Sequence, residues 1–518
     1  MQPDTATARS AAPPELSAQS EQELRRLIRE RTGIVLMDHQ RDNLRLAVAK
    51  ACAALGHEDC EAYLRALRAQ TSPTAGMEPL IAGITVGESY FFRDIEQLDL
   101  LRDELLPELI ARKRAVGERT LRVWSAGCSN GQEIYSIAML LEELLPDHAD
   151  WVLHLLGTDI NTEVLANAVR GHFSEWSFRT TPAAIKARYF SASDAGGHEL
   201  ARRIRARVKF AYLNLTADAF PSILTETGAL DLVLCRNVFI YLEPEAAAGV
   251  MRRFAECLVP GGLLLLGPSD FVSWPTESLE RTQHGNAGYF RRVGGDLPQS
   301  TPPAGAAPRG GTARHPGANA KQAAALVTPT DPERPRARGF GAPPVHADAA
   351  LTDERLIELL RAERWRDALI AVEQGLRESG GSAKRWQIKA KALANLGRLS
   401  EALQACEQSL ALDATEKHTW LIKGSVLAEL DRLREAEEAL RRVLYLDREF
   451  LEAHYALGLL LLRAGRADAG LKSLRNALRL AERGDPAREV HNAQGMSYGR
   501  LAEVLRNEIA MYAGAPIR

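Results

Sequence analysis

Five apolar segments, separated by stretches long enough to hold helices, constrain the middle of the chain more than any other feature of the sequence. They read LRVWSAG, VLHLLGTDI, VKFAYLNL, LDLVLCRN and GGLLLLGPSD, at residues 121–127, 152–160, 208–215, 230–237 and 261–270. Each is apolar through most of its length instead of alternating with polar residues, which is typical of strands covered on both faces. The pattern predicts a doubly wound α/β sheet, in which ligands bind beyond the carboxyl ends of the strands.

The polar residues at these strand ends predict a nucleoside-binding site. The first strand runs into SAGCSNGQEIYS, where small residues allow the backbone to approach a ligand before a helix begins near Glu133. The second strand ends at Asp159, where an acid can accept hydrogen bonds from both hydroxyls of a ribose. NAD is disfavoured, because GCSNGQE is not the GxGxxG fingerprint.

A 34-residue period runs through the C-terminal part of the chain. The positions that repeat are Trp386 and Trp420; Gly397, Asp431 and Gly465; and Leu412, Leu446 and Leu480, with small residues at Ala402, Ala436 and Gly470. The period resembles that of the tetratricopeptide repeat, a helix–turn–helix unit that usually binds other proteins. We predict three clear units, a degenerate first unit from residue 363, and a capping helix at about 487–512 with a polar face toward water. The alternative is an ordinary helical bundle with chance spacing.

Composition separates these parts, because the text from Gly294 to about residue 350 is dense in Pro, Gly and Ala and predicts a disordered linker. The expected division is a disordered N-terminus at 1–20, a helical domain at 21–85, the α/β domain at 86–293, the linker at 294–349, the repeats at 350–484, and a capping helix and tail at 485–518.

Two helices are predicted near the N-terminus. The first, SEQELRRLIRERTG, has a natural stop at Gly33, and the second is DHQRDNLRLAVAKACAALG. In the second, Leu44, Val48 and Cys52 or Ala51 form an apolar face. The basic residues on the other side predict either a solvated surface or a binding surface; they are Arg41, Arg45 and Lys50.

Charge and cysteine usage exclude several classes of function. The 65 basic and 67 acidic residues leave a net charge of −2, which offers no electrostatic case for nucleic acid or an anionic membrane. Six cysteines lie in apolar surroundings without CxxC pairs or histidine partners, so we expect reduced core cysteines and no metal site. Because no stretch resembles a signal peptide or reaches the length of a membrane span, we expect a cytoplasmic protein without membrane insertion.

Six motifs in order resemble those of the CheR-type chemotaxis receptor methyltransferases, which use S-adenosylmethionine. They are ITVGESYFFRD, LRVWSAGCSNGQEIYSIAM, GTDINTEVLANA, LNL, LVLCRNVFIYL and PGGLLLLGPSD, and the resemblance covers about residues 24–293. Family members with appended tetratricopeptide repeats are known. The resemblance implies a helical domain before a catalytic α/β domain with a small β-insert. It also implies methyl transfer to glutamates in the cytoplasmic domains of chemoreceptors, with S-adenosylhomocysteine as product, and the repeats imply an unidentified protein partner.

The resemblance also assigns residues. Arg93 and Tyr241 match the catalytic pair, and Phe91 and Phe92 would pack behind Arg93. The cofactor-binding positions are Gly87, Ser89, Arg93, Glu133, Asp159, Asn214, Leu215, Arg236 and Asn237. The family's receptor-facing helix corresponds to Arg41, Arg45 and Lys50, a sparse basic face.

The chemistry makes few acid–base demands, because a glutamate side chain is already an anion at pH 7 and the sulfonium methyl is already activated. We expect Arg93 to orient the carboxylate, and Tyr241 to fix the carboxylate or the sulfonium. The alternatives are a core tyrosine with a satisfied hydroxyl and, for Arg93, an interface ion pair with Asp94 or Glu88.

Several positions depart from the family's pattern: Gly87, Asn130, Gln132, Ile134 and Pro268. They keep two other functions open, a degenerate cofactor-sensing scaffold and a methyltransferase for another protein or a small molecule. The insert at 191–209 is short, which makes binding of a receptor tail peptide doubtful. Its alternating basic residues predict one face of a solvent-facing edge strand, or else a contact with an acidic receptor helix or with the protein's own repeats; they are Arg203, Arg205, Arg207 and Lys209.

Overall fold

The structure, a computed structural model, describes residues 16–70, 74–85, 87, 89–194, 196–217, 220–222, 225–270, 277–284, 287–294, 353–362, 364–379, 381–490 and 496–513. The predicted linker at 294–349 lies outside the described residues except for Gly294, and so does most of the predicted disordered N-terminus.

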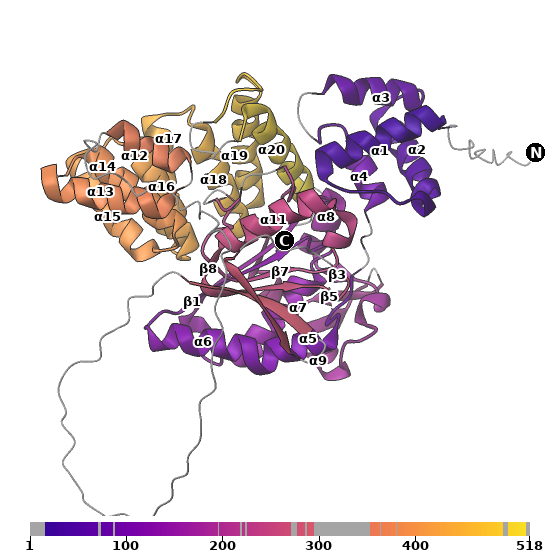
Figure 1. The fold of residues 1–518 in the computed structure, drawn as a ribbon, viewed down its shortest axis with the longest axis horizontal. Coiled ribbons are helices and arrows are strands. Elements are labelled where there is room, and N and C mark those ends of the chain that lie inside the picture. Colours follow the sequence, from indigo (N-terminus) through magenta and orange to yellow (C-terminus); the bar gives the residue numbers. More distant parts are fainter. Residues whose placement is uncertain are drawn as a thin grey trace, which may run out of the picture.

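An N-terminal domain of four α-helices, with one short 3-10 turn, stands at one end of the molecule (Figure 1). The helices are α1(Ala18–Thr32), α2(Arg41–Leu55), α3(Cys60–Ala69) and α4(Glu78–Ile84), with the turn η1(Asp38–Gln40) before α2. Helix α1 ends at Gly33, whose φ of 71° suits glycine, as predicted. Leu44, Val48 and Cys52 are buried in the domain's core, which confirms the predicted apolar face of α2. Helix α1 begins inside the segment predicted to be disordered.

A seven-stranded sheet forms the centre of the molecule, in the order β6-β2-β1-β7-β8-β10-β9. The five predicted segments form its parallel part: β1(Thr120–Ala126), β2(Val152–Asp159), β6(Val208–Tyr212), β7(Leu230–Cys235) and β8(Leu258–Leu266). An antiparallel hairpin that we did not predict, β9(Leu279–His284) and β10(Ala287–Arg292), adds to the β8 edge. Its strands are short and partly exposed, so they lack the continuous apolar pattern of the parallel strands.

Helices cover both faces of the sheet. Alternate residues of each strand point to opposite faces, so the helices on the two faces pack over two separate apolar cores. Val123 lies in one core with α7(Gln132–Leu144), whereas Trp124 lies in the other with α11(Pro244–Cys257). The remaining elements of this region are α5(Ile95–Leu100), η2(Leu101–Leu105), α6(Leu106–Ala115), η3(His148–Asp150), α8(Thr162–Arg170) and η5(Phe239–Tyr241). This is the doubly wound arrangement expected from the sequence.

A small β-insert is present as a three-stranded sheet, β3-β5-β4, with β3(His172–Phe173), β4(Phe190–Ala192) and β5(His198–Leu200). It begins and ends earlier in the chain than the predicted range of 191–209. Two short helical segments, η4(Glu175–Phe178) and α9(Ala183–Tyr189), connect β3 to β4. The predicted basic strand face at 203–209 is wrong, because α10(Arg202–Arg205) is helical and β6 begins only at Val208. Arg203 and Arg207 instead pair with Glu142 of α7, at 3.3 and 3.6 Å.

The repeats form a stack of helix pairs (orange to yellow in Figure 1). The pairs are α12(Asp353–Arg361) with α13(Trp365–Ser379), α14(Ala383–Asn395) with α15(Leu399–Leu412), α16(Lys417–Glu429) with α17(Leu433–Leu446), and α18(Leu451–Arg463) with α19(Ala467–Ala481). The repeat position held by Ala402, Ala436 and Gly470 was predicted to need a small residue. Gly470 confirms this, because a Cβ there would lie 2.8 Å from Leu462 and 3.0 Å from the Gly458 carbonyl oxygen.

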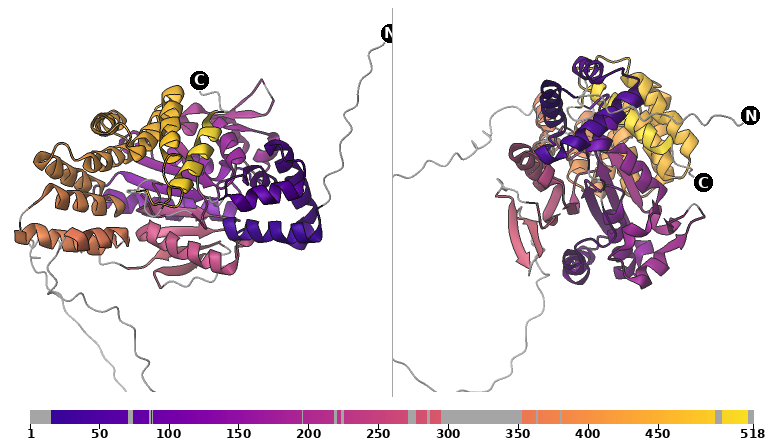
Figure 2. Two further views of the ribbon diagram at one scale, coloured as in Figure 1. Left: turned by 90° about the horizontal axis from the view of Figure 1, so that it is seen from above. Right: turned by 90° about the vertical axis from the view of Figure 1, so that its right-hand side faces the viewer.

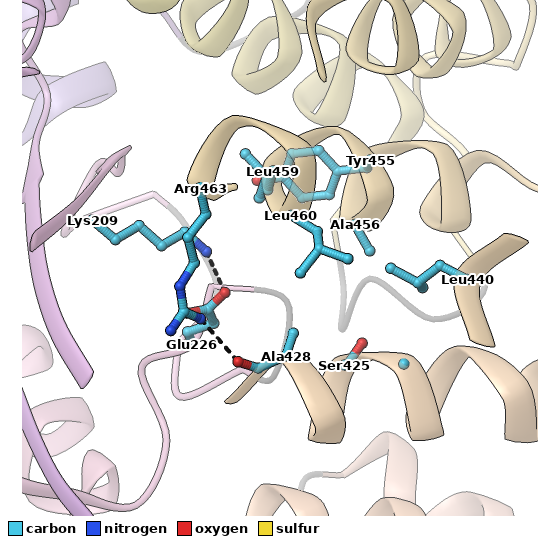
Figure 3. Close-up of a pocket in the computed structure, with 11 residues that line it drawn as sticks. Lys209, Glu226, Ser425, Ala428, Leu440, Tyr455, Ala456, Leu459, Leu460 and Arg463 are labelled. Atoms are coloured by element: carbon cyan, nitrogen blue, oxygen red, sulfur yellow. Dashed lines mark hydrogen bonds and ion pairs between the residues drawn. The ribbon is translucent and has the colours of Figure 1, made fainter. Parts of the chain in front are cut away.

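The stack lies against the α/β domain (Figure 2). Arg122, near the start of β1, forms a buried ion pair of 2.7 Å with Glu429 of α16. A small pocket lies beside it, where Lys209 and Glu226 of the α/β domain meet Tyr455 and Arg463 of α18 (Figure 3). The inner helices of the repeats therefore contact the amino ends of the strands, away from the ends where ligands are expected.

The last helix, α20(Tyr498–Ala513), packs on α19 as a cap but begins eleven residues later than predicted. The prediction that it turns a polar face to water is wrong. Its buried residues include Arg500, Glu503, Asn507 and Glu508, because this face meets the α/β and N-terminal domains. Within the part of the chain that the structure describes, no helix combines the length and the apolar character needed to cross a bilayer.

Candidate functional site

A cavity opens at the carboxyl ends of β1, β2, β6 and β7, where the sequence places the ligand. The described residues that line it include six of the predicted site positions: Gly87, Asp159, Asn214, Leu215, Asn237 and Tyr241. Ser89, Arg93, Glu133 and Arg236 are not among the described lining residues.

The turn between β1 and α7 forms the floor of the cavity. Gly127 has a φ of 76°, and a Cβ there would lie 2.4 Å from Val238 of the opposite wall, so this position needs glycine. The amides of Gly127 and Cys128 both donate to the Thr158 carbonyl, at 2.8 and 2.9 Å. The turn is thereby fastened to the end of β2 with its backbone against the cavity.

Asp159 lies beside this turn at the end of β2. Its carboxylate accepts hydrogen bonds from the amides of Ser129 and Asn161, each at 2.9 Å, and burial raises its pKa. These two donors orient the carboxylate while leaving each oxygen with a further lone pair. A ribose with two adjacent hydroxyls matches that acceptor pair.

The N-terminal domain supplies one wall of the cavity, which sequence reasoning missed. The Val35 amide donates to the Tyr241 carbonyl at 2.8 Å, Ile34 bridges to Leu242, and Asn214 Nδ2 donates to the Arg31 carbonyl at 2.9 Å. The residues of this domain that line the cavity are Thr32, Ile34, Leu36, Gln40, Ile84 and Thr85. The sequence shows only the helical spacing of apolar residues in these segments. That spacing does not reveal which domain a helix packs against.

Arg236 lies behind the cavity wall in a buried network. Its guanidinium pairs with Asp94 at 2.6 Å and Glu133 at 3.2 Å, and it donates to Gln97 and to the Arg93 carbonyl, each at 2.8 Å. The side chain is 3% exposed. Arg236 and Glu133 therefore join the end of β7, the start of α7 and the segment around Arg93, and their direct contact with a cofactor stays a prediction.

The GESYFFRD segment is anchored by its two phenylalanines. Phe91 is fully buried among Phe173, Phe178 and Phe190, with ring centroids 4.7 to 5.3 Å apart, and Phe92 is 4% exposed. This confirms that the rings pack behind the segment. Arg93 is half-buried, with its guanidinium carbon 5.6 Å from the centre of the Tyr90 ring. Of the two partners that we considered for Arg93, Asp94 pairs with Arg236, and Glu88 lies outside the described residues.

Three of the departures from the family pattern, Gly87, Asn130 and Gln132, take part in the contact between the turn and the segment around residues 87–89. The Gly87 carbonyl accepts from Asn130 Nδ2 at 3.0 Å and from Ser129 Oγ at 3.0 Å, and Gln132 Nε2 donates to the Ser89 carbonyl at 3.3 Å. Side chains of the turn thus hold the backbone of the loop. A Cβ at Gly87 would lie 3.2 Å from Val164.

Tyr241 and Asn237 lie on a loop that Asp270 holds. Asp270 accepts from the amides of Asn237 at 2.6 Å, Gly267 at 2.8 Å and Ile240 at 3.2 Å. Asn237 has a positive φ of 60°, so these bonds stabilise an uncommon backbone conformation. Sequence reasoning missed Asp270; its place at the end of the GPSD motif was the available signal. The Tyr241 hydroxyl has no hydrogen-bond partner among the described residues.

The predicted receptor-facing residues lie on α2 and its first turn. Arg41 pairs with Glu21 of α1 at 2.6 Å, Arg45 lies 3.9 Å from Asp42, and Lys50 is exposed. Arg41 follows Gln40, which lines the cavity. Their role in receptor binding stays a prediction.

A doubly wound sheet with a glycine-containing turn and an acid at adjacent strand ends is the arrangement of enzymes that bind a nucleoside cofactor. Residues 87–286 match the family described as "CheR methyltransferase, SAM binding domain", and residues 383–416 and 418–450 match the tetratricopeptide repeat family. The chain belongs to the CheR methyltransferase family. S-adenosylmethionine is its cofactor, as predicted.

Relatives support this assignment along the catalytic half. The chain is 33% identical to Chemotaxis protein methyltransferase 2 of Vibrio cholerae over 244 residues, 47% of this chain and 82% of the relative. It is 36% identical to the Chemotaxis protein methyltransferase of Escherichia coli over 251 residues, 48% of this chain and 82% of the relative. Among solved structures, a crystal structure of MamA aligns with 30% of this chain and 92% of its own, at 17% identity and a TM-score of 0.23.

The residues present fit S-adenosylmethionine. Asp159 offers the acceptor pair for the ribose, and Asn214 and Leu215 form the wall beside it. The cysteines fit the prediction as well, because all six are free and buried.

Proposed function

We propose that this chain transfers a methyl group from S-adenosylmethionine to glutamate side chains in the cytoplasmic domains of chemoreceptors, which forms methyl esters. The observation that carries the proposal is that Tyr241 lines the same cavity as Asp159, with a hydroxyl that has no hydrogen-bond partner among the described residues. The relatives' names as chemotaxis methyltransferases support the receptor as substrate.

The chain's residues would act by alignment. When bound, S-adenosylmethionine supplies a methyl group that its sulfonium already activates toward in-line displacement. Tyr241 would donate its hydroxyl hydrogen bond to the incoming carboxylate, and Arg93 would orient that carboxylate by charge. These two donors are sufficient for the reaction without a general base, because the attacking carboxylate oxygen carries no proton to remove.

The same proposal places the reaction in the cytoplasm, where the signalling domains of receptors lie. Six free cysteines suit a reducing compartment. The repeats would hold a further protein on the surface that the catalytic domain does not cover.

Tyr241→Phe is expected to lower kcat for receptor methylation by about 10- to 100-fold, the size of a lost hydrogen bond to a charged group. The Kd for S-adenosylhomocysteine should change less than twofold, since the ring that lines the cavity remains. The measurement is base-labile label transferred from S-adenosylmethionine to membranes that carry the organism's chemoreceptors. Tyr445→Phe is the matched control, because Tyr445 is 76% exposed on α17.

Arg93→Ala tests the second catalytic residue in the same assay and should also lower labelling. Label that is stable to base would contradict a carboxyl ester and point to another substrate. An absence of label while the protein still binds S-adenosylhomocysteine would favour the cofactor-sensing scaffold.

A further inference from the structure

Helix α20 lies between the two domains that enclose the cofactor cavity. It packs along the edge strand β6 and against α8, and it belongs to the same continuous apolar core as β1, β2 and α7 (Figures 1 and 2). The helix is more than 280 residues from these elements in the sequence, so the contact depends on the repeats that deliver it. The contact is polar at its centre.

A buried cluster joins α20 to both domains at once. Glu503 accepts from the Thr74 amide at 3.1 Å and pairs with Arg500 at 2.7 Å. Arg500 donates to Thr74 Oγ1 at 3.2 Å and to the Tyr212 hydroxyl at 3.4 Å, and the Thr74 and Tyr212 hydroxyls lie 2.9 Å apart. None of the four residues is more than 6% exposed. Thr74 belongs to the N-terminal domain and Tyr212 to the sheet.

A second group of contacts covers the free edge of β6. Glu508 accepts from the Tyr212 amide at 3.1 Å, and the Tyr512 hydroxyl donates to the Phe210 carbonyl at 3.2 Å. The backbone groups of an edge strand otherwise need water or another strand. Side chains of α20 therefore take the place of a neighbouring strand at this edge.

Both ends of the cluster lead directly into the cavity walls. Tyr212 is followed by Leu213, Asn214 and Leu215, all of which line the cavity. Thr74 lies in the loop before α4, whose last turn brings Ile84 and Thr85 into the opposite wall. A shift of Thr74 relative to Tyr212 would therefore change the separation of these two walls.

We propose that α20 is a clasp that fixes the N-terminal domain against the sheet and thereby sets the affinity for S-adenosylmethionine, with Thr74, Arg500 and Glu503 as positioning residues. The repeat domain is then part of the cofactor site's support as well as a platform for partners. This inference depends on the cofactor, which the family defines, and not on the receptor substrate, so it can fail or succeed independently of the proposed function.

The test uses the full chain with Thr74→Val, which removes the hydroxyl shared by Arg500 and Tyr212 while keeping the side chain's shape. Isothermal titration with S-adenosylhomocysteine should show a Kd raised about 5- to 20-fold, and Thr74→Ser should restore it, because serine keeps the hydroxyl. Arg506→Gln is the control on the same helix, since Arg506 forms an exposed ion pair with Glu482.

Hydrogen exchange separates this role from general destabilisation. In Thr74→Val, amides of residues 74–85 should exchange faster while those of β1 and β7 stay protected. An unchanged Kd together with faster exchange at 74–85 would overturn the link to cofactor affinity. Unchanged exchange, or faster exchange throughout the sheet, would overturn the clasp itself.

The clasp should also depend on pH through Glu508. Burial raises the pKa of this carboxyl from 4.5 to about 7, with Glu226 acting in the same direction and Lys209 and the Tyr212 amide opposing it. Tyr512 also faces it, and Glu508 Oε2 has no hydrogen-bond partner among the described residues. The folded state therefore keeps the proton that the unfolded chain releases above about pH 4.5, so stability from this group is lost as pH rises through about 7.

We expect the Tm of the wild type, relative to that of Glu508→Gln, to rise as the pH falls from 8 to 6. The amide imitates the protonated acid and does not titrate, so it removes this dependence. A Tm difference that stays constant over this range would contradict a titrating Glu508.

Discussion

Asp159→Asn is expected to raise the Kd for S-adenosylmethionine about 100-fold or more. The carboxylate offers two oxygens to the ribose hydroxyls, and hydrogen bonds to a charged group each contribute about 1.5–3 kcal/mol. The amide retains one acceptor and places an NH₂ group against the Ser129 or Asn161 amide, both of which now donate to Asp159 at 2.9 Å. The turn that forms the cavity floor should therefore shift as well.

Isothermal titration of the full chain with S-adenosylmethionine measures this effect, with the circular dichroism spectrum as a check on folding. Asp150→Asn is the matched control, because Asp150 lies on the surface near the start of β2 with its side chain 66% exposed. A Kd within threefold of the wild type in Asp159→Asn would show that the ribose is held elsewhere.

Arg236→Met should produce the largest loss of stability in the catalytic domain. The variant leaves Asp94 and Glu133 without their shared cation, with the Arg236 side chain now 3% exposed between them. Removing one partner of a buried ion pair costs about 3–5 kcal/mol. For a domain of this size, the corresponding fall in Tm is roughly 6–20 °C.

Differential scanning calorimetry provides the measurement, and Arg102→Met provides the control. Arg102 pairs with Asp99 and Asp103 on the surface, with its side chain 43% exposed, and should cost less than about 1 kcal/mol. The Arg236→Met variant also shows whether Arg236 contacts the cofactor directly. A nearly unchanged Tm with a lost affinity for S-adenosylmethionine would show a direct cofactor contact instead of a structural network.

Much of the site could be predicted from the sequence because its residues directly follow buried strands. Asp159, Asn214 and Asn237 each lie at a strand end, and parallel strands bring such ends together at one edge of the sheet. Arg236 and Glu133 also follow or precede predicted elements, but they lie outside the described cavity lining, and their contact with a cofactor stays a prediction. Their mutual ion pair could not be predicted, since it depends on how α7 and the loop around Arg93 pack against β7.

The sequence by itself determined the local elements of this protein. Burial on both faces of a strand, the helical period and the 34-residue repeat each leave a regular signal within a short window, so strands, helices and repeat units were predictable. Tertiary structure alone decided which surfaces meet. The N-terminal domain forms a cavity wall, and α20 is buried through Arg500, Glu503 and Glu508 instead of facing water. These contacts join residues hundreds of positions apart, and a polar side chain in an amphipathic helix has the same pattern whether water or a buried partner faces it.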